Sequence, residues 1–189
     1  AGRRTQLTAC TSIPRCGAAD RAVGRGVGGE GGALGWEAGS DRGGRERLGE
    51  GRHKSCYAEL AANPGKRTLI TDVAVPLSRL PEAGTTALAD CEANGLDVYL
   101  VGHVGDGNFH LTLFLDEDGS QDATAEAVVH RMVSLALSLG GTSTGEHGVG
   151  LRKLAYMEEE HGASLDVMRA IKRTLDPTRI LNPGKKIPA

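Results

Sequence analysis

The most restrictive feature of this sequence is an Asp-Gly pair between two apolar runs of strand-like composition. Asp106 and Gly107 separate DVYLVGHV, residues 97–104, from NFHLTLFL, residues 108–115. Asp-Gly favours a two-residue type I′ turn, because both central residues of that turn need positive φ. The sequence therefore predicts an antiparallel hairpin with Asp106 and Gly107 as its central turn residues.

This turn would place two histidines opposite each other. Counting outward from the turn, His103 on the first strand faces His110 on the second, and directly opposed Cβ atoms lie ~4.5–5.5 Å apart on one face. Two imidazoles at this separation can bind one metal ion, with zinc–nitrogen bonds of ~2.0–2.1 Å. We therefore expect a metal or catalytic role for both. The alternative is that they only fill polar positions near a turn.

The same register divides the hairpin into two faces. One face is apolar and is expected to pack against helices; it contains Val98, Leu100, Gly102, Val104, Phe109, Leu111, Leu113 and Leu115. The other contains Tyr99, Val101, His103, His110, Thr112 and Phe114. A slip of one residue would mix the two sets, so the hydrophobic pattern supports this alternation.

A second stretch, TSTGEHGVG at residues 142–150, carries further candidate groups. Glu146 and His147 are framed by glycines, which let the backbone approach a ligand closely. The carboxylate of Glu146 would complete a His-His-Glu set with an open coordination position, as in catalytic metal sites. His147 is suited to proton abstraction at neutral pH, because an imidazole has an unperturbed pKa near ~6.5. The alternative is a flexible, solvated turn.

The remaining pattern predicts an α+β fold. Apolar periodicity, Pro and Gly give the order β-α-β-β-α-loop-α-α, which indicates an antiparallel or mixed sheet with helices on one face. Besides the hairpin, the expected elements are a strand within 68–82 that Pro76 stops, and helices at 80–94, 124–141, 151–161 and 164–175.

Residues 1–51 differ from the rest of the chain. They are rich in Gly and Arg, contain no Lys, and show no apolar periodicity. Such a segment cannot bury enough surface to offset its ordering entropy, so we expect it to be disordered. An aberrant segment is the other interpretation, because GC-rich DNA read in a wrong frame or through an unspliced intron has this composition. The domain expected to fold is therefore 52–189.

Composition excludes several classes of protein. The formal net charge of -2 lacks the basic excess of a nucleic-acid binder. No apolar run is long enough for a transmembrane segment. The 4 cysteines show no C-x-x-C pattern, and we interpret them as free thiols in a reducing compartment. A mitochondrial and a bacterial cytoplasmic location both fit.

Three motifs, taken in order, resemble a known family. GHVGDGNFH at 102–110, GEHGVG at 145–150 and LDPTRILNPGK at 175–185 are similar to the C-terminal domain of FAD-linked oxidases. The similarity is greatest to the group of D-lactate dehydrogenase (cytochrome) and the glycolate oxidase flavin subunit. It implies a ferredoxin-like α+β domain and oxidation of a small D-2-hydroxy acid, with hydride transfer to FAD. It also implies a divalent metal, zinc or manganese, and an electron acceptor such as a cytochrome or quinone.

The resemblance also implies roles for individual residues. The matching positions are His103, His110 and Glu146 for the metal, His147 for the catalytic base, Arg52 for the substrate carboxylate and Asn182 for the flavin. The three metal positions and the base are those reached from the hairpin and the glycine-framed stretch. For Asn182 the alternative is a tight turn.

Differences from the family narrow the expected activity and substrate of this chain. The family's FAD-binding domain has no counterpart in these 189 residues, so we expect the chain alone to be inactive. Relatives that use dicarboxylates carry Lys at the position of Ile70 and Asn at that of Thr112, so D-lactate is expected rather than 2-hydroxyglutarate. The alternative function is a non-enzymatic metal-binding or partner-binding α+β domain.

Overall fold

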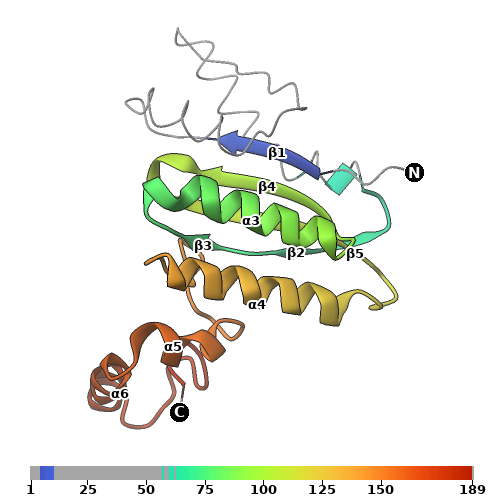
Figure 1. Ribbon diagram of the computed structural model, residues 1–189. Coiled ribbons are helices and arrows are strands. Elements are labelled where there is room, and N and C mark those ends of the chain that lie inside the picture. The colour runs from blue at the N-terminus through green and yellow to red at the C-terminus, as the bar shows by residue number, and fades with distance from the viewer. Residues whose placement is uncertain (1–4, 11–56, 58–59, 62, 189) are drawn as a thin grey trace, which may run out of the picture.

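The computed structural model describes residues 5–10, 57, 60–61 and 63–188 (Figure 1). Its strands are β1 (Thr5–Cys10), β2 (Lys66–Ile70), β3 (Val73–Ala74), β4 (Asp97–His103) and β5 (Asn108–Asp116). Its α-helices are α3 (Leu80–Ala93), α4 (Asp122–Ser138), α5 (Met157–His161) and α6 (Ser164–Leu175). Short 3-10 turns lie at Leu77–Arg79, Val104–Asp106 and Leu154–Tyr156.

The strands form one mixed sheet. Its order is β1-β4-β5-β2, and β3 pairs with β5 next to β2. β4, β2 and β3 are each antiparallel to β5, whereas β1 is parallel to β4. The predicted α+β fold with a mixed sheet is confirmed. Strand β1 lies within the segment 1–51, for which the sequence predicts disorder. The other residues of that segment, and Arg52 directly after it, lie outside the described residues.

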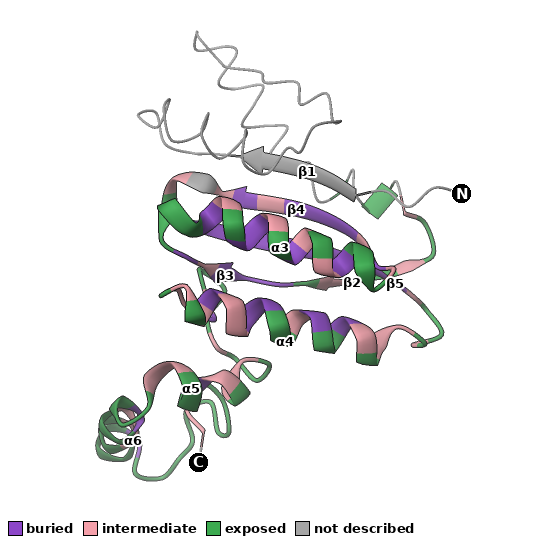
Figure 2. Ribbon diagram, in the orientation of Figure 1, coloured by how far each residue is buried: buried purple, intermediate pink, exposed green. Residues whose placement is uncertain are grey.

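Helices α3 and α4 cover one face of this sheet, as predicted. Figure 2 shows buried and exposed positions alternating along both helices. The buried positions share one core with the apolar face of the hairpin. This core contains Val98, Leu100, Phe109, Leu111, Leu113 and Leu115 from the strands, Leu80, Ala83, Ala87 and Cys91 from α3, and Ala125, Val128, Met132, Val133 and Ala136 from α4. The face assignment made from the hydrophobic pattern is therefore correct for these strand residues.

Cys91 is a core residue and not a reactive thiol. It is free and fully buried against the sheet. Burial raises the pKa of its thiol to about 12, which keeps it protonated at physiological pH.

The turn between β4 and β5 differs from the predicted type I′ turn. Val104–Asp106 form a 3-10 turn, and within the loop only Gly107 has positive φ, at 73°. His103 consequently lies opposite Asn108 instead of His110. The pairing has shifted by two residues, and a shift of two keeps every side chain on its face. The two histidines are therefore diagonal neighbours and not directly opposed.

A contact outside the hairpin accounts for this wider turn. The backbone N–H of Val75 donates to the carbonyl of Gly107 at 3.0 Å. A Cβ atom at position 107 would lie only 2.0 Å from the Val75 carbonyl oxygen. The loop is thus packed against the segment before α3, and this long-range contact outweighs the local preference of Asp-Gly.

The predicted strand before Pro76 is interrupted at Thr71 and Asp72. Thr71 still follows β5, because its N–H donates to the Leu111 carbonyl at 2.9 Å and its hydroxyl accepts the Leu111 N–H at 2.8 Å. Asp72, at 2 % exposure, is buried between β2 and β3. This interruption brings a charged side chain into the interior of the domain.

The chain after α4 is less helical than predicted. Helix α6 has the predicted bounds, but the helix expected at 151–161 begins only at Met157. In Figure 1, α5 and α6 lie on the far side of α4 from α3. Among the helices that the structure describes, none combines the length and the apolar character needed to cross a membrane.

We expect Gly107→Ala to destabilise the domain more than Gly119→Ala. Both glycines have positive φ, 73° and 75°, so alanine at either position costs about 1–2 kcal/mol of backbone strain. At 107 the new Cβ would also displace the Val75 carbonyl, whereas at 119 its nearest neighbour is 3.4 Å away. Urea denaturation followed by circular dichroism should show roughly twice the loss for Gly107→Ala. Equal losses would contradict the packing of the turn against Val75.

Candidate metal centre

The structure brings His103, His110 and Glu146 together. The Oε1 atom of Glu146 lies 3.1 Å from His103 Nε2 and 3.2 Å from His110 Nε2. The two imidazole rings are nearly perpendicular, at 87°, with centroids 5.8 Å apart. One potential ligand atom from each residue falls within 4.8 Å of the others. Diagonal placement on β4 and β5 therefore still lets both rings reach the same carboxylate.

His110 is held with one ring nitrogen turned toward Glu146. Its Nδ1 lies 3.0 Å from the carbonyl oxygen of Thr71. Because a carbonyl can only accept, Nδ1 carries the proton and Nε2 presents its lone pair toward Glu146. Burial lowers the pKa of His110 more than the Thr71 carbonyl and nearby carboxylates raise it. The imidazole is therefore kept neutral, the form that binds metals.

His147 lies beside this cluster and is open to solvent. Its ring stacks on that of His110, with centroids 5.0 Å apart and an angle of 14° between the planes. Its Nε2 is 3.7 Å from Glu146 Oε1, and half of the side chain, 52 %, is exposed. This position lets His147 reach a molecule bound next to the cluster.

The loop that carries Glu146 and His147 is fastened to the sheet by Asp72. The backbone N–H groups of these two residues donate to the Asp72 carboxylate, at 3.2 Å and 3.0 Å. The hydroxyl of Thr144 donates to the same carboxylate at 3.3 Å. These hydrogen bonds argue against the alternative of a flexible, solvated turn, because they hold the loop backbone against the sheet.

Two further donors complete the surroundings of Asp72. Lys153 donates to its Oδ2 at 2.9 Å and to its backbone carbonyl at 2.6 Å, and Asn108 donates to Oδ1 at 2.8 Å. Burial alone would raise the pKa of Asp72, but the hydrogen bonds from His147, Lys153 and Asn108 together hold it well below its ordinary value. Asp72 is therefore ionised inside the domain.

The start of this loop has its own anchors. Thr142 and Ala74 exchange two backbone hydrogen bonds, which extend β3 by one bridge. The Glu160 carboxylate on α5 accepts the hydroxyl of Thr142 and, at 3.0 Å, the N–H of Ser143. The loop is therefore fixed to the sheet and to α5 before it reaches Glu146.

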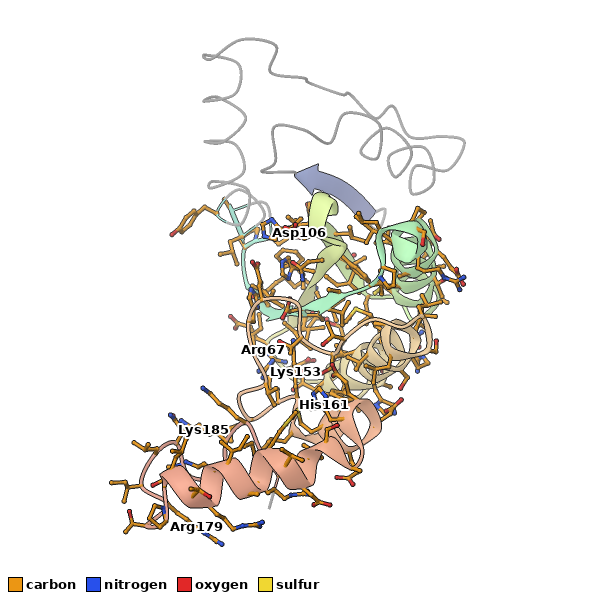
Figure 3. All side chains as sticks on the ribbon, turned by 90° about the vertical axis from the view of Figure 1, so that its left-hand side faces the viewer. Arg67, Asp106, Lys153, His161, Arg179 and Lys185 are labelled. Atoms are coloured by element: carbon orange, nitrogen blue, oxygen red, sulfur yellow. The ribbon has the colours of Figure 1, made fainter. Side chains whose placement is uncertain are left out.

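The sequence prediction did not include Asp72, Lys153 or Asn108. One signal for Asp72 was present, because a lone carboxylate interrupts the apolar run between Ile70 and Val73. Nothing in the spacing of Lys153 connects it to that run, since its side chain reaches Asp72 from 81 residues away. Figure 3 shows Lys153 between the sheet and the segment that contains α6.

The donor atoms fit a divalent metal such as zinc or manganese. Two imidazole nitrogens and one carboxylate oxygen are common ligands of zinc, and the Thr71 carbonyl supplies the outer hydrogen bond that orients a ligating histidine. A second grouping, Asp72 with His110 and His147, has similar spacing. It is less suited, because the Asp72 carboxylate already accepts hydrogen bonds from the loop, Asn108 and Lys153.

Of the other two predicted site residues, the structure describes only Asn182. Arg52 lies outside the described residues. Asn182 is exposed, has a φ of 46°, and its carbonyl accepts the N–H of Lys185 at 3.2 Å, as in a tight turn. Figure 3 shows Arg179 and Lys185, on either side of Asn182 in the sequence, beside α6 and away from Asp106.

We expect Gly145→Ala to detach residues 142–150, the site loop, from the sheet, whereas Gly148→Ala should not. A Cβ at position 145 would lie 1.8 Å from Asn108 Nδ2 and 2.8 Å from Asp72 Oδ1, but at 148 nothing lies within 4 Å. Hydrogen exchange of the Glu146 and His147 amides should accelerate by about tenfold or more in the first variant. Gly148→Ala carries only backbone strain at its φ of 76°. Similar exchange in both variants would contradict the described docking of the loop.

Comparison with known proteins gives relatives that are oxidoreductases by name. The chain is 42 % identical over 143 residues to a probable mitochondrial D-lactate dehydrogenase of Danio rerio, covering 75 % of this chain and 29 % of the relative. It is 45 % identical over 139 residues to the mitochondrial D-lactate dehydrogenase [cytochrome] of Arabidopsis thaliana, covering 72 % and 24 %. It is 36 % identical over 141 residues to glycolate oxidase subunit GlcD of Bacillus subtilis, covering 73 % and 29 %. The chain thus spans about a quarter of the length of these relatives.

A family model matches most of the chain. The model is described as FAD linked oxidases, C-terminal domain, and it matches residues 16–186. The match starts inside the Gly/Arg-rich segment, before the point where the sequence motifs indicated a resemblance. It includes the hairpin, the site loop and the C-terminal motif. The chain therefore belongs to the family of the C-terminal domain of FAD linked oxidases.

Proposed function

We propose that this chain is the metal- and substrate-binding part of a FAD-dependent dehydrogenase of small D-2-hydroxy acids, with D-lactate as the substrate. The observation that carries the proposal is the contact of Glu146 with His103 and His110, with His147 stacked alongside. Relatives named D-lactate dehydrogenase, at 42 % and 45 % identity, support this choice of chemistry.

In this proposal His103, His110 and Glu146 hold a divalent ion, zinc or manganese. When bound, the metal supplies Lewis-acid stabilisation of negative charge on the substrate hydroxyl oxygen, and FAD accepts the hydride. His103 and His110 contribute imidazole nitrogens. Glu146 contributes the negative charge that neither histidine supplies.

His147 is the proposed general base. Oxidation of a 2-hydroxy acid removes the hydroxyl proton and a hydride from the α-carbon, and leaves a 2-oxo acid. His147 takes the hydroxyl proton on a ring nitrogen, because its exposed ring lies next to the proposed metal ligands. The hydrogen bond from its backbone N–H to Asp72 holds the backbone from which this ring projects.

The side chains next to His110 suit a substrate with one carboxylate. Ile70 on β2 lies directly opposite Thr112 on β5, two residues along from His110 on the same face. Ile70 is 45 % exposed and offers no charge for a second carboxylate. This apolar position favours D-lactate over 2-hydroxyglutarate. Arg52 remains the predicted partner of the substrate carboxylate.

FAD and the electron acceptor are proposed from the relatives. The relatives are about four times as long as the matched region, and we infer that FAD is bound mainly by the part that this chain does not cover. Asn182 remains a predicted contact of the flavin. The relative named D-lactate dehydrogenase [cytochrome] supports a cytochrome as acceptor, and its mitochondrial location supports the same location here.

Metal binding by the chain tests the proposed ligands His103, His110 and Glu146. We expect zinc titration by calorimetry to show one site, and Glu146→Gln or His103→Gln to weaken it by about 100-fold or more, because each removes a direct ligand. The control is His130→Gln, since His130 stacks on Tyr156 outside the cluster. Unchanged zinc affinity in the ligand variants would contradict the assignment.

Activity in a chimera tests the proposed oxidation of D-lactate and the role of His147 as the base. Residues 64–189 of this chain would replace the matching segment of the Arabidopsis thaliana relative, and dye reduction would be measured with D-lactate and with 2-hydroxyglutarate. We expect turnover of D-lactate, and a fall of about 10²–10⁴-fold for His147→Gln at nearly unchanged zinc affinity, as for loss of a general base.

The outcomes of this experiment separate the two candidate functions. Preference for D-lactate supports the dehydrogenase. A folded chimera that binds FAD and zinc but does not oxidise either acid would favour a non-enzymatic metal-binding domain and contradict the proposal.

A further inference from the structure

We propose that Asp72 and Lys153 are positioning residues for the metal ligand Glu146 and the base His147. This inference rests on the proposed function, since it assigns a task within that site. Neither residue is a ligand in the proposed centre. Both act on the backbone of the loop from which the two functional side chains project.

Asp72 fixes the loop through adjacent backbone groups. Its carboxylate accepts the N–H of Glu146 and the N–H of His147, and these consecutive bonds define the direction in which both side chains leave the backbone. The Glu146 side chain then reaches His103 and His110, and the His147 ring meets His110. With only 1 % of its side chain exposed, Asp72 forms these bonds away from competing water.

Asp72 also connects the site loop to β5, the strand that carries His110. Its neighbour Thr71 holds Nδ1 of His110 through a backbone carbonyl. Asp72 and Thr71 together set the distance between the loop and β5, because they are consecutive residues. A single dipeptide thus places one proposed ligand from the sheet and one from the loop.

Lys153 supplies the positive charge that offsets the free-energy cost of burying an ionised Asp72. A buried carboxylate without a cation would be costly, and the Lys153 ammonium lies 2.9 Å from Oδ2 with 15 % of its side chain exposed. Its second bond, to the Asp72 carbonyl at 2.6 Å, holds the strand backbone as well. Lys153 follows the loop in sequence, so the ion pair fastens the far end of the segment 144–153.

The chain contains a matched arrangement that serves as a control. Asp176, 4 % exposed, accepts the consecutive N–H groups of Ile180 and Leu181, each at 3.0 Å, and pairs with Lys172. This second Asp–Lys pair shapes the C-terminal tail and does not touch the histidine cluster. Variants at both places should disturb a loop, but only those at Asp72 and Lys153 should disturb the site.

The first experiment measures amide hydrogen exchange by NMR in the metal-free 189-residue chain. We expect Asp72→Asn to accelerate exchange at Glu146 and His147 by about tenfold or more relative to amides in β5, whereas Asp176→Asn should accelerate Ile180 and Leu181 instead. Unchanged exchange at Glu146 and His147 in Asp72→Asn would overturn the proposal. Equal acceleration there in Asp176→Asn would also overturn it, since it would indicate general destabilisation.

The second experiment measures zinc affinity by calorimetry and keeps the proposal testable if Asp72→Asn does not fold. We expect Lys153→Met to weaken zinc binding by about 10–100-fold, the range for groups that orient a ligand, and Lys153→Arg to stay within about threefold of the wild type. Lys172→Met is the control and should bind zinc normally. Equal affinities of Lys153→Met and the wild type would overturn the proposal.

The two experiments separate this inference from the proposed function. If the wild-type chain binds no zinc, the proposed metal centre fails, while the exchange measurement still decides whether Asp72 fixes the loop.

Discussion

The geometry of the candidate site depends on one buried carboxylate. Asp72 sits at an interruption of the sheet and accepts hydrogen bonds from the loop that carries Glu146 and His147. An isolated charge in the interior would be strongly unfavourable, but here backbone N–H groups, Asn108 and Lys153 surround it. Because these donors come from segments far apart in sequence, satisfying one carboxylate brings the segments together.

The sheet provides the rigid half of the site. His103 and His110 project from adjacent antiparallel strands whose opposite face is buried under α3 and α4. This packing fixes the strand register, and the register fixes which side chains share the site face. Helix α4 then returns the chain to the sheet, where Thr142 bridges to Ala74 and the site loop begins. The core that stabilises the fold therefore also determines the spacing of the imidazoles.

Much of this could be predicted from sequence because the signals were local. The alternation of apolar residues in 97–115 determined the faces of the hairpin, and helix periodicity with Gly or Pro boundaries located α3, α4 and α6. The exact pairing of His103 could not be predicted, because the turn is shaped by Val75. The attachment of the site loop to the sheet was also not predicted. It depends on Asp72 and Lys153, and two residues 81 positions apart leave no periodic pattern in the sequence.

The measurement that tests the central claim most directly is a crystal structure of this chain with zinc, using anomalous scattering to locate the ion. The account predicts one ordered zinc bonded to Nε2 of His103, Nε2 of His110 and the carboxylate of Glu146, with His147 beside it and Asp72 still hydrogen-bonded to the loop. A zinc ion bonded to Asp72 in place of Glu146, or an unoccupied His103–His110–Glu146 cluster in zinc-saturated crystals, would contradict it.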